Sequence, residues 1–347
     1  MRQRRPQERL TNAIPRIARA YGLAEARVRT WVSFIAVSGA LQTAVERGDL
    51  VSYQLKGGVA LELRFPGIVR ATRDLDVGLP GTRAHRVERF GAALAAGFDR
   101  FAFRVRREPY HMERADTVRV EVAITYEGRP FQTIDVDLGP EDAPTEPIAP
   151  TIDVIETLAI PIPRPISCVA MAAQIAQKIH AGTNPTIIAD PVQDRARDIV
   201  DIVLLDELGQ LNVESVRTAA EAIFTQRAEH SWPPNIPQYP DSWLATMGTL
   251  ASELKLARNG PEVVSLFSRV MARLVGVSLV PGFEYQFINL PLTDSQNATP
   301  PDHPNVVRLQ ELAREGWRIH TLLGNPSYGA YVIAVLERIS ENTASPS

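Results

Sequence analysis

Two glycines and two aspartates mark the ends of one short stretch of the sequence. Residues 56–77 read KGGVALELRFPGIVRATRDLDV, with Asp74 and Asp76 two positions apart near its end. Side chains alternate on a strand, so this spacing points both carboxylates to one face. Two like charges side by side need a compensating cation, and oxygen-only ligation suits magnesium. The pair therefore predicts a divalent metal site on a strand.

A third carboxylate would complete a cradle for two metal ions. The strand-like segment 132–138, QTIDVDL, offers Asp135, and Asp137 lies on the same face. Glu121, on the neighbouring predicted strand, is a further candidate. Asp135 is the predicted third ligand, and Asp137 stays an alternative to it. Magnesium, or manganese in its place, is the expected metal.

The glycines supply the second half of the pattern. Gly57 and Gly58 stand between a predicted strand and a short helix, where backbone N–H groups can approach a phosphate closely and the helix N-terminus favours an anion. A glycine-rich phosphate loop that is followed along the chain by metal-binding carboxylates is typical of enzymes that transfer phosphoryl or nucleotidyl groups. Either motif alone is common in surface turns. Their order and spacing are what favour a site that binds a nucleoside triphosphate.

Lysine is rare in this chain, which makes each lysine informative. Of the 37 lysines and arginines, only Lys56, Lys178 and Lys255 are lysines. A compact ammonium group can contact a phosphate where a planar guanidinium would not fit. Lys56 directly precedes the two glycines, so it could reach a phosphate or brace the glycine turn. Lys178 lies on a predicted alanine-rich helix, where the plain alternative is a surface lysine.

The pattern of apolar residues predicts an α+β protein in three parts, with boundaries at residues 1–145, 146–280 and 281–347. The first part begins with two helices, at about 8–20 and 26–47, and continues as a mixed sheet flanked by helices. A proline-rich connection spans 140–165. The strands predicted for the first part are 50–55, 74–79, 101–107, 117–126 and 131–138, with short helices at 59–64 and 83–97.

The remaining two parts differ in character. The middle part is predicted to be mostly helical. The last part follows a small β-α-β-β pattern, with a polar loop at 293–304. The helices predicted for the middle part are 167–181, 194–208, 213–229 and 241–276, and the elements of the last part are 285–290, 306–315, 317–323 and 331–338.

Composition narrows the class of protein. The chain has 347 residues, a net charge of -3 and one cysteine, Cys168, which excludes an internal disulfide and fits a reducing cytoplasm. No run of 18 apolar residues occurs, and the basic start MRQRRPQERL has no apolar core after it, so neither a membrane span nor a secretory signal is expected. Residues 1–129 carry 23 Lys and Arg against 14 Asp and Glu, a net +9. This basic portion could face a polyanion, or could be an ordinary solvated surface.

Four motifs in order resemble those of the AbiEii/AbiGii toxin family, which includes the MenT toxins. The family belongs to the DNA polymerase β-like nucleotidyltransferases. Its KGG-x-x-L motif is similar to KGGVAL at 56–61, and its R-x-[ST]-x-D-[LI]-D motif to RATRDLD at 70–76. Its two helical motifs are similar to QIAQKIHA at 174–181 and RARDIVDI at 195–202. The resemblance spans about residues 28–210, and nothing in it corresponds to the stretch after 280.

The resemblance implies a site and an activity. It implies a polymerase β-like mixed sheet joined to a helical domain, with the active site between them. It implies that Lys178 contacts the triphosphate, and that Asp198 orients that lysine or assists deprotonation of the acceptor hydroxyl. It places Thr72 in the site and an aspartate at position 135. Nucleotide contacts are expected from Lys56, Gly57, Gly58, Arg70, Thr72 and Lys178; catalytic residues are Asp74, Asp76, Lys178 and Asp198.

The expected protein is therefore a bacterial toxin that moves a nucleoside monophosphate from a triphosphate to an acceptor hydroxyl. The resemblance implies an antitoxin encoded nearby and favours the 3′ end of tRNA as acceptor. Two alternatives stay open. The acceptor could be a hydroxyl on a protein or a small molecule, or the site could be catalytically silent in a protein that binds a partner.

Overall fold

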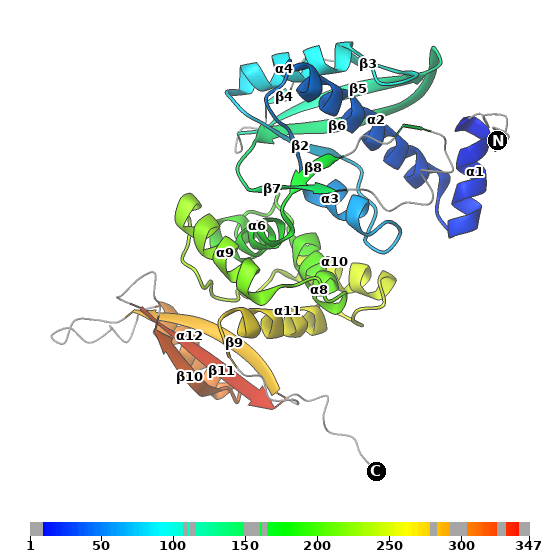
Figure 1. Cartoon of the computed structure of the whole chain (residues 1–347). Coiled ribbons are helices and arrows are strands. Elements are labelled where there is room, and N and C mark those ends of the chain that lie inside the picture. The colour runs from blue at the N-terminus through cyan, green and yellow to red at the C-terminus, as the bar shows by residue number, and fades with distance from the viewer. Residues whose placement is uncertain are drawn as a thin grey trace. The chain divides into compact units, whose positions relative to one another are not determined.

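The computed structural model describes residues 10–106, 110–111, 116–148, 160–161, 165–277, 283–291, 304–324 and 331–339. The chain divides into two compact units, Met1–Ala170 and Met171–Ser347. Both units contain helices and strands (Figure 1), and the sheet of the first unit has parallel and antiparallel neighbours. The predicted α+β class is therefore confirmed. No helix within the described ranges is long and apolar enough to cross a membrane.

The sheet of the first unit has the strand order β3-β5-β6-β2-β1-β8-β7, and β4 pairs with β5 outside this path. The pairs β2·β6 and β1·β8 are parallel, and the remaining neighbours are antiparallel. The strands are β1 (Gln54–Leu55), β2 (Leu75–Leu79), β3 (Phe101–Val105), β4 (Tyr110–His111), β5 (Val118–Tyr126), β6 (Arg129–Pro140), β7 (Thr145–Ile148) and β8 (Ile166–Val169).

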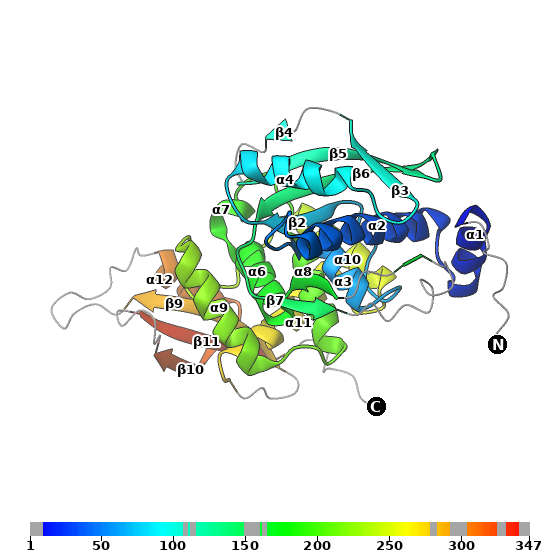
Figure 2. The same cartoon turned by 45° about the horizontal axis from the view of Figure 1, so that its top comes forward.

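Four helices accompany this sheet: α1 (Leu10–Tyr21), α2 (Glu25–Arg47), α3 (Gly57–Arg64) and α4 (Arg83–Ala95). α2 and α4 pack against each other and against β6, and Figure 2 shows both helices lying across the sheet. The middle of α2 is buried almost without interruption, which explains why its apolar residues are not confined to one stripe. It ends at Gly48, whose φ of 79° would strain any side chain with a Cβ.

The hairpin of β5 and β6 sets the register of the acidic strand. Its turn is Glu127 and Gly128, both with positive φ, which is the backbone of the tight turns that match strand twist. Buried and half-buried residues alternate along β5, as a strand with one face in the core requires. The ladder pairs Arg119 with Asp137, and a register shift lies between Ile124 and Thr125.

Three of the predicted elements in this unit differ in the structure because of pairing between strands. The strand predicted over 50–55 is only Gln54–Leu55, where the chain pairs with β2. The helix predicted from 167 begins at Met171, because Ile166–Val169 is strand β8, buried beside β1. The proline-rich connection contains the short strand β7 at the edge of the sheet, where a strand tolerates proline.

The second unit begins with a helical bundle. The helix predicted over 241–276 is two helices: the first ends at Glu253, and Lys255 follows with a positive φ of 58°. The second begins at Gly260, which packs so closely that an added Cβ would lie 2.3 Å from the carbonyl oxygen of Leu244. The Asn259 side chain caps the second of them by accepting from the N–H of Glu262. The helices are α6 (Met171–Thr183), α7 (Pro185–Ile188), α8 (Ala196–Glu207), α9 (Val213–Arg227), α10 (Asp241–Glu253) and α11 (Gly260–Leu274).

The end of the chain has the predicted β-α-β-β order. Strands β9 (Phe283–Pro291), β10 (Arg318–Gly324) and β11 (Tyr331–Ile339) form a sheet in the order β10-β11-β9. Helix α12 (Pro304–Arg314) packs on one face of this sheet. The predicted loop at 293–304 lies almost wholly outside the described residues. The core between helix and sheet is Ile288, Leu312, Trp317 and Leu336.

Candidate active site

The two glycines pack directly against the segment that carries the paired aspartates. Helix α3 begins at Gly57, whose φ is +58°, a conformation that favours glycine. A Cβ built on Gly57 would lie 1.9 Å from Oδ2 of Asp76, and one built on Gly58 would lie 2.8 Å from Oγ1 of Thr72. The structure therefore brings together both glycines, Thr72 and Asp76, four of the residues predicted for the site.

Asp74 and Asp76 lie at the start of β2. Asp74 lies one residue before the strand, and its side chain is 45% exposed. The observed strand is therefore one residue shorter than the predicted one. Asp76 lies within the strand and pairs in register with Asp137 of the parallel strand β6. Asp135, the predicted third ligand, lies two residues earlier on β6, opposite Glu121 of β5. Both candidate third carboxylates thus lie on the strand next to the aspartate pair.

An arginine that the sequence did not single out lies among these carboxylates. Arg119 donates from Nε and Nη2 to the two oxygens of Asp137, each at 2.7 Å, and its Nη2 lies 3.5 Å from Oδ2 of Asp74. The hydrogen bonds to Asp137, with the negative charges of Asp137, Asp74 and Asp135, hold the pKa of Arg119 above its usual value. Arg119 is a fixed positive charge in an otherwise acidic cluster.

Lys56 is engaged away from the glycines that follow it. Its amino group donates to the carbonyl oxygen of Pro140, the last residue of β6, and to the carboxylate of Asp142 just beyond it. This arrangement braces the chain after the acidic strand, which is closer to the bracing role than to a phosphate contact. Arg70 lies in the segment between α3 and β2.

A second group of predicted residues lies in the helical bundle. Nζ of Lys178, on α6, is 2.5 Å from Oδ1 of Asp198 and 2.8 Å from Oδ2 of Asp201, both on α8. The Lys178 side chain is 7% exposed and that of Asp201 is fully buried. The structure brings Lys178 and Asp198 together, and it adds Asp201, which lies three residues after Asp198 on the same side of α8.

Three side chains outside these groups have simpler roles. Asp194 was predicted to share the helix of Asp198, but it precedes α8 and accepts a hydrogen bond from the N–H of Ala196. Cys168 is buried on β8, and burial raises the pKa of its thiol to about 12, so it is an inert core residue at neutral pH. His180 is buried against Phe224, which is the environment of a structural histidine.

One comparison decides the family. The model of the nucleotidyl transferase AbiEii toxin family, of type IV toxin–antitoxin systems, matches residues 40–262. The chain belongs to this family. The match includes the glycine pair, the paired aspartates, Asp135 and the Lys178 group, and it ends within α11. The resemblance predicted from the motifs is confirmed: the protein is a nucleotidyltransferase of a type IV toxin–antitoxin family, and this family implies an antitoxin partner.

Solved structures give distant likenesses to this AbiEii-family protein. MenT4, a nucleotidyltransferase toxin from Mycobacterium tuberculosis H37Rv, is 16% identical with a TM-score of 0.45, over 75% of this chain and 98% of that one. The antibiotic-resistance factor ANT(2″)-Ia is 16% identical with a TM-score of 0.33, over 57% of this chain and 94% of that one. A crystal structure of ANT(2″)-Ia with adenylyl-2″-tobramycin gives 17%, a TM-score of 0.31, and coverage of 57% and 99%. No curated relative matches the sequence.

The acidic cluster suits a metal ion by the chemistry of its donors and not by their present arrangement. No group of three or more Asp, Glu, His or Cys side chains in the described part of the chain is arranged to hold one. The cation that lies among Asp74, Asp135 and Asp137 is the guanidinium of Arg119. The donor set nevertheless fits magnesium or manganese by its chemistry, because it consists of carboxylate oxygens on adjacent strands that already attract a positive charge. Asp74, Asp76 and Asp135 stay the predicted ligands.

Proposed function

We propose that this AbiEii-family protein is a magnesium-dependent toxin that transfers a nucleoside monophosphate from a nucleoside triphosphate to the 3′-terminal hydroxyl of tRNA in the cytoplasm. The observation that supports this most strongly is the approach of Gly57 and Gly58 to Asp76 and Thr72. A phosphate chain bound at the start of α3 would lie beside the carboxylates of β2, which is the juxtaposition that nucleotidyl transfer needs.

The residues of the first unit would bind and orient the triphosphate. The start of α3 would offer backbone N–H groups to an anion, and the missing Cβ of both glycines lets Asp76 and Thr72 lie close beside that position. Thr72 would add a hydroxyl donor beside Gly58, and Arg70 a positive charge. Divalent metal held by Asp74, Asp76 and Asp135 would neutralise charge on the phosphates and lower the pKa of the acceptor hydroxyl.

The residues of the second unit would contact the charged triphosphate and take up the proton of the acceptor hydroxyl. The ammonium of Lys178 would contact the triphosphate, and Asp198 would hold that lysine and accept the proton of the acceptor hydroxyl. In the reaction the acceptor oxygen forms a bond to the α-phosphorus. The bond from that phosphorus to the bridging oxygen breaks, and pyrophosphate leaves with the electron pair.

The choice of tRNA is supported by charge and by the family resemblance. The basic balance of residues 1–129 would attract a polyanion, and binding of that kind weakens as salt rises. Two alternatives compete with this proposal. In the first, the acceptor is a hydroxyl on a protein or on a small molecule. In the second, the site is catalytically silent and the protein binds a partner.

One labelling experiment separates these outcomes. Purified protein would be incubated with each α-labelled nucleoside triphosphate, magnesium and total bacterial RNA and protein, beside Asp74→Ala and the control Asp49→Ala, which changes an exposed aspartate after α2. Label in tRNA-sized RNA, absent with Asp74→Ala and kept with Asp49→Ala, is the expected result. Label in protein alone would replace tRNA by a protein acceptor. No label in either, together with no binding of magnesium-nucleotide, would favour the silent site.

A further inference from the structure

A buried carboxylate lies on the helix that the two glycines begin. Glu62 of α3 is 1% exposed, and it stands four residues after Gly58, on the same side of the helix. Gly58 lies against the side chain of Thr72, and Glu62 accepts a hydrogen bond from the backbone N–H of the same residue at 3.1 Å. One face of α3 thus contacts Thr72 at two points.

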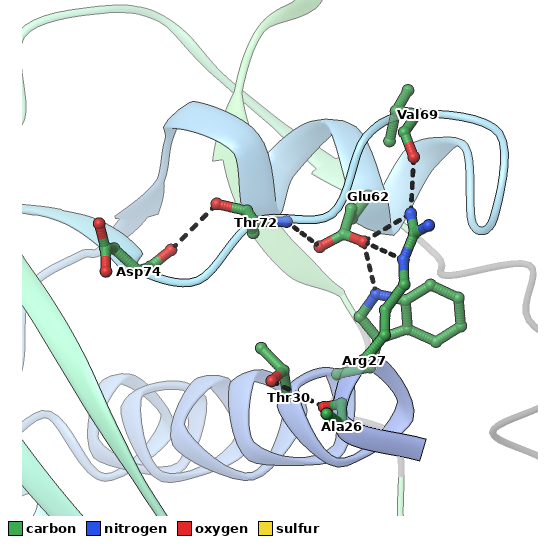
Figure 3. Close-up of polar contacts among 8 residues, drawn as sticks. Ala26, Arg27, Thr30, Glu62, Val69, Thr72 and Asp74 are labelled. Atoms are coloured by element: carbon green, nitrogen blue, oxygen red, sulfur yellow. Dashed lines mark hydrogen bonds and ion pairs between the residues drawn. The ribbon is translucent and has the colours of Figure 1, made fainter. Parts of the chain in front are cut away.

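The two oxygens of Glu62 have different partners, as Figure 3 shows. Oε1 accepts from the indole N–H of Trp31 at 2.9 Å and from Nε of Arg27 at 2.8 Å, both on α2. Oε2 accepts from Thr72. Burial raises the pKa of Glu62, while the donors from Trp31, Arg27 and Thr72 oppose that rise. A buried charge without partners is costly, and the charged donor Arg27, with Trp31 and Thr72, offsets that cost.

Arg27 makes a second connection to the same segment. Its Nη2 donates to the carbonyl oxygen of Val69 at 2.6 Å as well as pairing with Glu62. The segment between α3 and β2 is therefore held at Val69 and at Thr72. Asp74 follows Thr72 by two residues, and its carbonyl oxygen lies 3.5 Å from Oγ1 of Thr72. The contacts run from the helix α2, through Glu62, to the residues that lead into the aspartate pair.

We propose that Glu62 is a positioning residue for nucleotidyl transfer: its Oε2 fixes the backbone at Thr72, and so sets Thr72 against Gly58 and the aspartate pair against Gly57. The proposal rests on the proposed function for its catalytic consequence, but its structural part does not. Arg27, which contacts Oε1 through both Nε and Nη2, holds the carboxylate in the orientation that presents Oε2 to the loop. Glu62 touches neither the predicted metal ligands nor the predicted phosphate loop through its own side chain, so it acts through Thr72.

Glu62→Gln separates the two halves of this arrangement. The glutamine has the same shape, and its oxygen can still accept from Arg27 and Trp31. Its NH₂ group would then face the N–H of Thr72, so that a donor meets a donor and only the contact to the loop is lost. Trp31→Phe is the matched control, because it removes one donor to Oε1 and leaves Oε2 unchanged.

The test is amide hydrogen exchange of the full chain, read residue by residue by NMR. In the unmodified protein the Thr72 N–H should exchange as slowly as the interior amides of α3, such as that of Leu63. In Glu62→Gln it should exchange at least tenfold faster, with β5 unchanged, and Trp31→Phe should keep it slow. Fast exchange at Thr72 in the unmodified protein would overturn the proposal even if the glutamine variant does not fold. So would an unchanged Thr72 rate in Glu62→Gln.

Enzyme kinetics supply the catalytic half. Glu62→Gln should lower kcat at least tenfold at saturating nucleotide, and Trp31→Phe should lower it less than threefold. If exchange behaves as expected but the unmodified protein transfers no label to any acceptor, the proposed function fails and the structural role of Glu62 stands. If transfer occurs and Glu62→Gln has the kcat of the unmodified protein, the catalytic consequence of this proposal fails alone.

Discussion

The guanidinium of Arg119 forms a two-point ion pair with the carboxylate of Asp137, with both N–O distances at 2.7 Å. Asp137 is in turn the register partner of Asp76 on the parallel strand. The arginine therefore supplies positive charge at the place where the predicted metal ligands gather. A metal ion bound by these carboxylates would compete with Arg119 for their charge.

Replacing Arg119 with glutamine should raise the affinity of the protein for magnesium or manganese. The reason is that the carboxylates of Asp74 and Asp137 lose their internal counter-cation. An increase of about tenfold, roughly 1.4 kcal/mol, is expected. Isothermal titration with manganese in the absence of nucleotide measures it directly. Arg104→Gln, an exposed arginine of β3, is the control and should leave the affinity unchanged. Weaker binding by Arg119→Gln would mean that the arginine holds the ligands in place.

Gly57→Ala should destabilise the first unit and abolish nucleotide binding. The positive φ of Gly57 strains alanine, and the new methyl group would meet the carboxylate of Asp76. We expect a loss of about 2 kcal/mol or more in the free energy of unfolding, measured by urea titration. Gly91→Ala in α4 is the matched control, since nothing lies within 4 Å of its added Cβ. It should be neutral or slightly stabilising, and equal losses in both variants would contradict the close packing of Gly57.

Lys178→Met should be strongly destabilising whether or not the lysine binds nucleotide. The substitution leaves Asp198 and Asp201 without their shared cation in a buried position. Removing one member of a buried ion pair costs about 3–5 kcal/mol. Lys255→Met changes an exposed lysine and should have little effect. A loss below about 1 kcal/mol for Lys178→Met would show that the two carboxylates are relieved by protonation or by solvent.

Acid should weaken the helical bundle through two histidines. Burial lowers the pKa of His180 to about 3 and that of His230 to about 4. Because the folded-state values lie below the unfolded value of about 6.5, both histidines favour folding above pH 6.5, and this contribution is lost as pH falls toward 4 and 3. The free energy of unfolding should drop by about 1.4 kcal/mol for each pH unit and each histidine.

The same pH series on His230→Leu isolates one of the two contributions. The side chain of His230 lies against His180 and Phe224, so an apolar residue keeps the packing. The slope of unfolding free energy against pH between 6 and 4.5 should fall by about half. An unchanged slope would assign the acid sensitivity to other groups.

The sequence by itself determined the residues that carry chemistry and the elements that hold them. Glycine and alternating apolar residues act directly on the local backbone. These local effects placed Gly57 and Gly58 at the start of a helix and Asp76 on a strand. The four ordered motifs identified the family, which the match over residues 40–262 confirmed. The turn at Glu127 and Gly128 is equally local, and it lies between the strands predicted over 117–126 and 131–138.

Only the tertiary structure decided which side chains meet. Counted back from the turn, Arg119 would face Val136, but the register shift between Ile124 and Thr125 moves it opposite Asp137. One residue of shift turns a strand's side chains to the other face, and no local pattern records it. Glu62 and Asp201 look like surface charges in a helical sequence, yet both are buried with partners from distant elements. Their roles depend on contacts between segments far apart in the chain, which is the information that spacing along a sequence does not contain.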